Sequence, residues 1–377
     1  MAATAIMADR RKRNLTILSG VTLAFVLLAV LAVYQRAAQL APKFEPRAFF
    51  PGLTGQLNGV TEVDVTSKTG TLHIRQMQGK WNVAERDSFP ADAMQVAAAG
   101  RGLSDLEIIE PKTARADWLT YLGLGAPPSG NATEVKLIGA GGKVLADLLI
   151  GQAQGTPDEL GRSLLYVRRP DQNQAWLARG YLTPKAAVAD WLDKNVVAIA
   201  RDRLKGAVVT PPMGPSYTLS RDAKEAMDFK MTDLPRGREL SFEGSPDGVA
   251  SAIIGFSFDD VAKADQFDFN MAPQSVFNTF DGLNVTVKIA SKGMDRWASV
   301  SAQAGNPMVQ AEADAINARN KDWAYKLPEM KVNQILAPRE TLLRPADAPG
   351  AGAAKGPALP GLLGAPAAGG PPPAVRP

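Results

Sequence analysis

A basic cluster followed at once by a long uncharged run constrains this chain more than any other feature. Four consecutive basic residues at positions 10–13 precede an uncharged segment of residues 15–34. A helix of this length, at about 1.5 Å per residue, spans roughly 30 Å, the thickness of the hydrocarbon core of a bilayer. Only scattered cations follow the segment. The positive-inside rule therefore predicts a single-pass inner-membrane helix, with residues 1–14 cytoplasmic and the C-terminal part periplasmic.

A cleavable signal peptide is the main alternative for this segment. Such a peptide also starts with basic residues, but its apolar core is usually about 7–15 residues long and ends at an A-x-A-like site. The present run is longer and no strict A-x-A motif follows it. An uncleaved anchor in the lipid bilayer is the better interpretation. A buried helix of a soluble core fits less well, because such helices rarely lack a polar face over this length.

The counts of cysteine, histidine and charged residues narrow the possible functions. The chain has no cysteine and one histidine, His73, so thiolate chemistry is excluded and multi-histidine metal sites lack their usual ligands. We interpret His73 as a strand residue, because as a catalytic base it needs an oriented partner that the sequence does not identify. The net charge of +4 lies partly before the apolar run. No nucleic-acid-binding surface and no cofactor are predicted.

Composition divides the remainder of the chain into four parts. Residues 35–51 are rich in proline and aromatic residues and predict an extended linker. Residues 52–200 and 201–343 each have the length of an ordinary domain and predict two folded periplasmic lobes. Residues 344–377 consist mainly of proline, alanine and glycine. We predict a disordered tail there, because this composition cannot bury enough apolar surface to offset chain entropy.

Hydrophobic periodicity predicts a mixed fold for the first lobe. Alternation with a period of two in residues 60–65, 72–74 and 80–83 indicates a β-meander. A helix is predicted over residues 91–104, directly after a proline that suits a helix start. Further strands are predicted at 134–138, 143–150, 164–168 and 174–178, with a hairpin loop at 139–142, and a second helix is predicted from 184 through 191.

The second lobe shows a similar order of elements. Its identity to the first is too low to establish an internal duplication. Sheets that alternate with a few helices indicate two similar α+β lobes of antiparallel strands rather than a parallel βαβ succession. The predicted strands are 207–210, 216–221, 228–231, 276–280, 283–289, 296–300 and 323–327, and the predicted helices begin at Pro246 or cover 307–320 and 330–336.

Two segments superficially suggest ligand sites. The glycine-rich residues 139–142 precede Lys143 but lack the G-x-x-x-x-G-K-[ST] spacing of a phosphate loop, so a hairpin turn is predicted. Four carboxylates lie between residues 259 and 268, and such oxygen ligands suit Ca²⁺ or Mg²⁺. Their spacing matches no EF-hand loop. We interpret this segment as a solvated acidic loop.

Five residues are selected as candidate interaction or structural residues. Trp191 is framed by acids, including Asp193, and Trp81 stands in a predicted strand. Half-buried tryptophans with polar neighbours usually serve packing. Asp281 and Gly282 form a turn pair typical of a tight hairpin. No catalytic, cofactor-binding or metal-binding residue is selected.

Several short segments in a fixed order resemble a known family. Their order along the chain is similar to that of the bacterial family called domain of unknown function 4340 (DUF4340). The resemblance covers about residues 50–343 and implies a single-pass envelope protein without an established activity, often accompanying an ABC-type transport system similar to the auxiliary part of gliding-motility export machinery. It supplies no catalytic residues, and the long tail departs from the family's usual ending. The segments are 50–53, 80–83, 89–92, 121–124, 189–193 and 280–283.

These observations lead to one main functional hypothesis and two alternatives. We expect a membrane-anchored periplasmic binding or scaffold protein with partners in an ABC-type transport complex. The first alternative is an envelope hydrolase acting on peptidoglycan or polysaccharide, in which a pair of carboxylates, Asp190 with Asp193 or Asp259 with Asp260, converges in a cleft. The second alternative is a ligand-binding module that uses a groove between the lobes.

Overall fold

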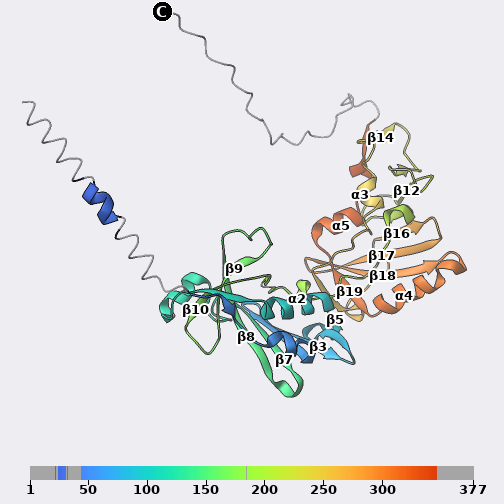
Figure 1. The fold of residues 1–377 in the computed structure, drawn as a ribbon. Coiled ribbons are helices and arrows are strands. Elements are labelled where there is room, and N and C mark those ends of the chain that lie inside the picture. The colour runs from blue at the N-terminus through green and yellow to red at the C-terminus, as the bar shows by residue number, and fades with distance from the viewer. Residues whose placement is uncertain (1–21, 23, 31, 33–43, 184, 346–377) are drawn as a thin grey trace, which may run out of the picture. The chain divides into compact units, whose positions relative to one another are not determined.

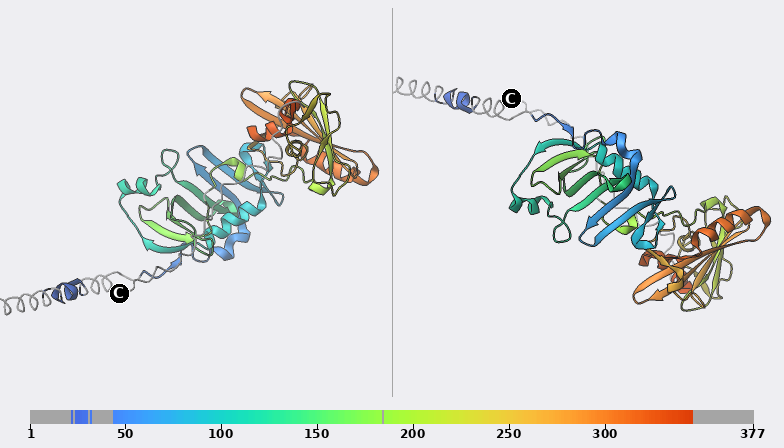
Figure 2. Two further views of the ribbon diagram at one scale, coloured as in Figure 1. Left: turned by 90° about the horizontal axis from the view of Figure 1, so that it is seen from above. Right: turned by 90° about the horizontal axis from the view of Figure 1, so that it is seen from below.

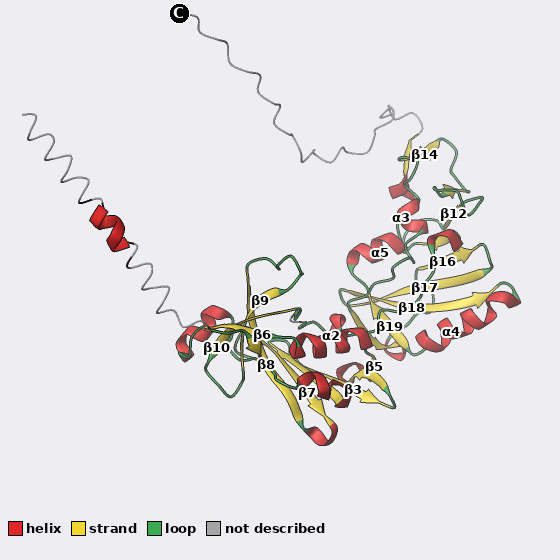
Figure 3. Ribbon diagram, viewed as in Figure 1, coloured by secondary structure: helices red, strands yellow, loops and turns green. Residues whose placement is uncertain are grey.

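The computed structural model describes residues 22, 24–30, 32, 44–183 and 185–345 (Figure 1). The chain divides into two compact units, Met1–Trp191 (unit 1) and Leu192–Pro377 (unit 2). Strands dominate both units, and helices are few (Figure 3). The predicted α+β class with antiparallel sheets is confirmed.

The predicted membrane span is described only in part. Positions 22, 24–30 and 32 are helical and exposed, and the rest of residues 15–34 lies outside the described residues. Within the part of the chain that the structure describes, no helix combines the length and apolar character needed to cross a bilayer. The predicted cytoplasmic residues 1–14 and nearly all of the predicted tail also lie outside the described residues.

Unit 1 contains one ten-stranded antiparallel sheet. Its strand order is β1-β6-β10-β9-β8-β7-β2-β3-β4-β5, so the neighbouring strands β7 and β2 come from distant parts of the sequence. The strands are β1 Arg47–Ala48, β2 Val60–Ser67, β3 Gly70–Met77, β4 Lys80–Val83, β5 Phe89–Pro90, β6 Glu107–Pro111, β7 Thr133–Gly139, β8 Val144–Gln154, β9 Ser163–Arg168 and β10 Ala175–Gly180.

Alternation along the strands gives this sheet two different faces. Val63, Val65, Val135 and Leu137 are at most 3 % exposed, and helix α2 (Ala93–Ser104) lies over this face near Val135 and Leu137. The opposite face carries the charged residues of the same strands, because successive side chains point to opposite sides. Short 3-10 helices complete the unit: η1 Leu53–Gly59, η2 Ala84–Arg86, η3 Ala116–Leu122, η4 Ala140–Gly142 and η5 Val188–Asp190.

Unit 2 contains an eight-stranded antiparallel sheet and a separate two-stranded one. The larger sheet has the order β13-β12-β11-β16-β17-β18-β19-β15, and β14 pairs with β20. The strands are β11 Leu204–Thr210, β12 Tyr217–Ser220, β13 Lys230–Met231, β14 Arg238–Leu240, β15 Asp260–Lys263, β16 Gln274–Thr279, β17 Leu283–Lys292, β18 Asp295–Ala304, β19 Trp323–Lys326 and β20 Leu343–Pro345.

Helix α4 (Gln310–Asn320) lies along this sheet beside β18, and is coloured orange in Figures 1 and 2. Asn317 fastens the helix to the strand, because its amide side chain donates to the Ala302 carbonyl and accepts from the Ala302 N–H, both at 2.8 Å. The other helices of the unit are α3 Asp247–Ala250, α5 Glu329–Ile335, η6 Arg201–Arg203, η7 Ala264–Gln266, η8 Pro307–Val309 and η9 Arg339–Leu342.

Most predicted elements are confirmed, and three are wrong. The helix predicted from 184 through 191 is reduced to the single turn η5. So short a segment gains little from helix propagation, and burial of Trp191 fixes its end instead. The helix predicted from Pro246 is only the four-residue α3, after which the Ser251 hydroxyl bonds the Asp247 carbonyl. The predicted acidic loop contains the edge strand β15, which pairs with β19.

Candidate functional site

Helix α2 is stabilised by an N-cap at its start and by buried apolar side chains on its inner face. The Asp92 carboxylate accepts hydrogen bonds from the N–H groups of Met94 at 2.8 Å and Gln95 at 3.4 Å, which caps the helix. Val96 and Leu103 face the sheet and are buried. Three of the outward positions, Ala93, Ala97 and Ala98, carry small side chains, whereas Met94 and Arg101 are exposed long ones. Space is left on both of its sides.

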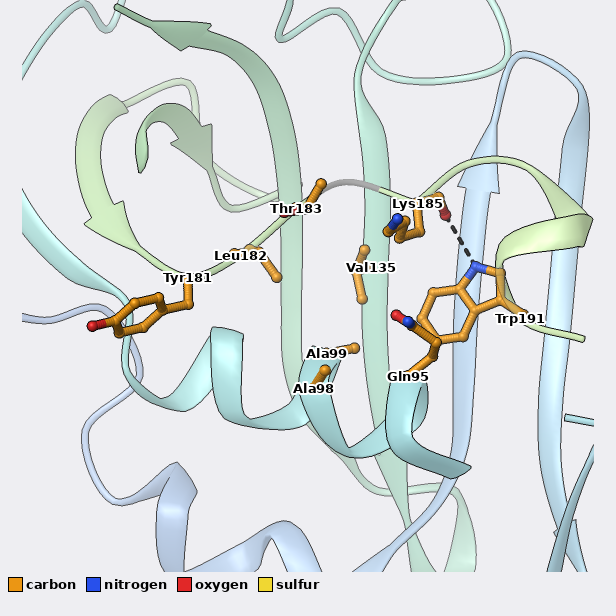
Figure 4. Close-up of a pocket in the computed structure, with 9 residues that line it drawn as sticks. All are labelled: Gln95, Ala98, Ala99, Val135, Tyr181, Leu182, Thr183, Lys185 and Trp191. Atoms are coloured by element: carbon orange, nitrogen blue, oxygen red, sulfur yellow. Dashed lines mark hydrogen bonds between the residues drawn. The ribbon is translucent and has the colours of Figure 1, made fainter. Parts of the chain in front are cut away.

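The first hollow beside α2 has a volume of about 110 Å³. Gln95 and Ala98 line it from α2, Val135 from the sheet, and Lys185 and Trp191 from the segment after β10. Figure 4 shows Gln95 and Trp191 at one end of this hollow. The hollow is small because the segment that follows β10 runs close along the helix.

The second hollow lies on the other side of α2 and has a volume of about 250 Å³. It is lined by Trp81, one of the candidate interaction residues, together with Leu57 from η1, Val96 and Gly100 from α2, and Leu137 from β7. Both volumes lie below the range of about 300–1,000 Å³ that is usual for small-molecule pockets. These hollows suit individual side chains better than a cofactor.

Trp191 and Trp81 thus line different hollows and have different surroundings. Trp191 is 2 % exposed, and its indole Nε1 donates to the Lys185 carbonyl at 3.1 Å. Its main-chain carbonyl accepts from the Asp92 N–H at 2.8 Å, next to the cap of α2. Trp81 is half-buried. Trp191 is therefore a buried, hydrogen-bonded part of the lining of the first hollow, whereas part of Trp81 is accessible to solvent.

Three of the four carboxylates named for a hydrolase, Asp190, Asp193 and Asp260, have local partners. Asp190 lies 3.8 Å from the Lys185 ammonium, and Asp193 accepts from the Asn195 N–H at 2.9 Å, as in a turn. Asp260 accepts from the Val261 N–H at 2.8 Å within edge strand β15. These contacts hold each carboxylate in its own turn or strand.

Asp281 and Gly282 form the turn between β16 and β17, and Asp281 takes part in a cluster of ion pairs with Arg203 and Glu312. Arg203 donates to Asp281 at 2.9 Å and forms a fork to Glu312 of α4 at 2.9 and 2.7 Å. Although burial acts to raise it, the pKa of Asp281 is lowered by hydrogen bonds from Thr279 and Arg203. Gly282 has a φ of 88°, and a Cβ there would lie 2.6 Å from Asn306 Nδ2. The pair joins the sheet to α4.

Two buried arginines organise loops in a way that the sequence pattern does not predict. Arg168, at the end of β9, is 7 % exposed, and Arg221, just after β12, is 3 % exposed. The Arg168 guanidinium donates to four main-chain carbonyls, and that of Arg221 donates to five. The only sequence signal is an arginine at the end of an alternating strand, beside a turn.

A row of charged side chains crosses the sheet face opposite α2. The strand registers place His73 beside Asp64, Asp64 beside Lys136, and Lys136 beside Asp147. Lys136 Nζ lies 3.3 Å from Asp147 and 3.4 Å from Glu134. Burial, together with the neighbouring Glu134 carboxylate, raises the pKa of Asp147 to about 6. One of its oxygens is buried without a hydrogen-bond partner among the described residues.

Replacing Asp147 with asparagine is expected to stabilise the fold at about pH 7.5 and to have little effect below about pH 4. The folded state holds the Asp147 proton up to about pH 6, whereas the unfolded state releases it near pH 3.9. The stability that this group contributes is therefore complete at low pH and is lost as the pH rises through 6. Thermal unfolding midpoints across a pH series measure the difference. The control variant is Asp171→Asn, because Asp171 is exposed. A gain in stability from Asp147→Asn that is the same at every pH would contradict the raised pKa of Asp147.

The fold and the hollows define an α+β protein of two antiparallel-sheet units, with two small surface recesses beside α2. A family model described as "Domain of unknown function (DUF4340)" matches residues 81–247. This match confirms, over these residues, the resemblance to the DUF4340 family that the order of the short segments predicts. No curated protein matches the chain. No solved structure matches it either.

Proposed function

We propose that this protein is a membrane-anchored periplasmic binding or scaffold protein, an accessory component of an ABC-type transport or envelope-assembly system. The basic cluster and uncharged run at residues 10–34 support the anchor and its orientation. The association that the family resemblance implies supports the kind of partner. The anchor also confines the protein to the membrane plane, which raises the effective concentration of a membrane-bound partner.

The exposed side of α2 between its two hollows is the observation that carries the binding role. Ala93, Ala97 and Ala98 are exposed there, so a partner segment can approach the helix backbone closely at these positions, and the exposed Met94 offers an apolar contact beside them. Each hollow accepts one or two apolar side chains, and the half-buried Trp81 offers an aromatic contact of the kind that interfaces favour. We define this surface, α2 with its two hollows, as the α2 groove.

The absence of cysteine from the chain permits a direct test. Ala98→Cys places a unique thiol in the α2 groove of the full-length protein in its native cells. A membrane-impermeant maleimide, added after the outer membrane is permeabilised, is expected to label this thiol because the groove faces the periplasm. A thiol-reactive photo-crosslinker on the same residue is expected to capture an integral membrane subunit of an ABC transporter, identified by mass spectrometry.

Lys68→Cys supplies the matched control, because Lys68 is exposed at the turn between β2 and β3 of the same unit. This variant is expected to react with the maleimide equally well but to yield little of the same crosslink. If the maleimide labels these thiols only after the inner membrane is lysed, the proposed periplasmic location of the lobes is refuted. Equal capture from both positions, or capture of no membrane subunit from position 98, would refute the α2 groove as the binding surface.

A further inference from the structure

The single histidine lies among three carboxylates on the sheet face opposite the α2 groove. The register of β2 and β3 pairs His73 with Asp64 and Arg75 with Glu62. Glu62 and Asp64 are two residues apart in one strand, so their side chains share this face. Glu85 reaches the same place from η2, which follows β4. The cluster is thus assembled from β2, β3 and η2, which lie close together in the sequence.

Three potential ligand atoms converge at one side of the imidazole. His73 Nδ1 lies 2.6 Å from Asp64 Oδ1 and 3.5 Å from Glu62 Oε1, and all three ligand atoms lie within 4.8 Å of one another. A tetrahedral ion with bonds of about 2.0–2.1 Å holds its ligand atoms roughly 3.3 Å apart. Small side-chain rotations therefore suffice to place these atoms around one ion.

The surrounding residues hold the ligands from outside, as in known metal centres. Glu85 Oε2 accepts from the His73 main-chain N–H at 2.9 Å, and Glu85 Oε1 lies 3.8 Å from His73 Nε2, the ring nitrogen away from the cluster. Arg75 Nε donates to Glu62 Oε1 at 2.7 Å. Metal-binding histidines typically direct the other ring nitrogen to a carboxylate, and metal-binding carboxylates are hydrogen-bonded in turn.

The charge of the cluster also favours a cation. Three carboxylates face one guanidinium and one imidazole, and each of the three ligand residues is partly buried. A divalent cation would compensate the excess negative charge directly.

We infer that Glu62, Asp64 and His73 form a binding site for one divalent transition cation of the Zn²⁺ type, with Glu85 and Arg75 as outer partners. One imidazole nitrogen and two carboxylate oxygens suit Zn²⁺ and similar ions better than the all-oxygen sites of Ca²⁺. His73 is 34 % exposed, so an ion can enter from solvent and keep a water ligand. This site is independent of the α2 groove and of the proposed scaffold function.

Titration of the full-length protein in detergent with ZnCl₂, after treatment with a chelator, tests the site. We expect one saturable ion per chain and a rise in the thermal unfolding midpoint with Zn²⁺ concentration, because the ion binds only the folded state. CoCl₂ in place of ZnCl₂ is expected to give a visible absorption spectrum that saturates at the same stoichiometry. His73→Gln and Asp64→Asn are each expected to weaken binding at least tenfold, and Glu85→Gln about tenfold.

Asp171→Asn removes an exposed carboxylate elsewhere in unit 1 and is expected to leave Zn²⁺ binding unchanged. The inference is overturned if the unmodified protein shows no saturable binding up to about 1 mM Zn²⁺. It is also overturned if folded His73→Gln binds as the unmodified protein does, because His73 and Asp64 would then be only a hydrogen-bonded pair. Should His73→Gln not fold, the Glu85→Gln titration and the Co²⁺ spectrum of the unmodified protein decide.

Discussion

Arg221→Ala is expected to destabilise unit 2 by about 3–5 kcal/mol, because it removes a buried guanidinium that donates to five main-chain carbonyls. Arg221 is 3 % exposed, and its guanidinium joins the segment that leads into β11 to the loop that follows β12. Its loss would leave several buried carbonyls without donors, each at a cost of about 1–3 kcal/mol before relaxation. Urea unfolding, followed by limited proteolysis with mass spectrometry, would show cleavage of unit 2 at lower urea. The carbonyl acceptors and their distances are Arg201 at 2.5 Å, Ala226 at 2.7 Å, Leu204 at 2.8 Å, Lys224 at 3.0 Å and Asp202 at 3.1 Å.

Two further variants define the origin of this effect. Arg236→Ala removes an exposed arginine of the same unit and is expected to change the free energy of unfolding by less than about 0.5 kcal/mol. Arg221→Lys keeps the charge but lacks the planar fork, and we expect it to lose most of the stability that alanine loses. If Arg221→Ala resists urea as well as Arg236→Ala does, the guanidinium does not organise these loops.

Gly206→Ala is expected to destabilise unit 2 by at least about 3 kcal/mol, which is the upper end for overpacking. A Cβ at Gly206 would lie 2.0 Å from the Leu219 main-chain oxygen, so β11 and β12 cannot keep their present separation. Gly206 pairs with Ser220 and follows an irregularity in the pairing of β11 with β16. The edge formed by β12 and β13 is therefore expected to detach. Faster hydrogen exchange in β12 and β13, measured by mass spectrometry, checks this result.

Gly248→Ala is the matched control in the same unit. No heavy atom lies within 4 Å of a Cβ at Gly248, and the residue is in helix α3. Alanine there is expected to be neutral or to stabilise by up to about 1 kcal/mol, since it restricts the unfolded chain. If hydrogen exchange in β12 stays slow in Gly206→Ala, then β11 and β12 tolerate a side chain between them, and the prediction is wrong.

Local signals are sufficient for much of the fold. Alternation identifies most strands, and Pro90 with the following apolar face identifies α2, although the structure places the N-cap at Asp92. The turn at residues 139–142 predicts the hairpin between β7 and β8. The failures are short elements, such as η5, α3 and β15. Their length is too small for intrinsic propensity to decide, so neighbouring elements determine their conformation.

The candidate sites are less predictable than the elements that carry them. Trp81 and Trp191 are recognisable as aromatic anchors, but the hollows that they line depend on where η1 and the segment after β10 meet α2. His73 lacks an identifiable partner in the sequence. It acquires partners only because β3 lies against β2 and because Glu85 turns back from η2.

The sequence by itself determined the class of the fold, the positions of its longer strands and helices, and the resemblance to the DUF4340 family. These depend on side-chain periodicity and turn chemistry, which act over a few residues. Only the tertiary structure decided which residues share a surface: the row from His73 to Asp147, the five carbonyls around Arg221, and the α2 groove. The physical reason is strand register, because a shift of one residue moves every side chain of a strand to the other face.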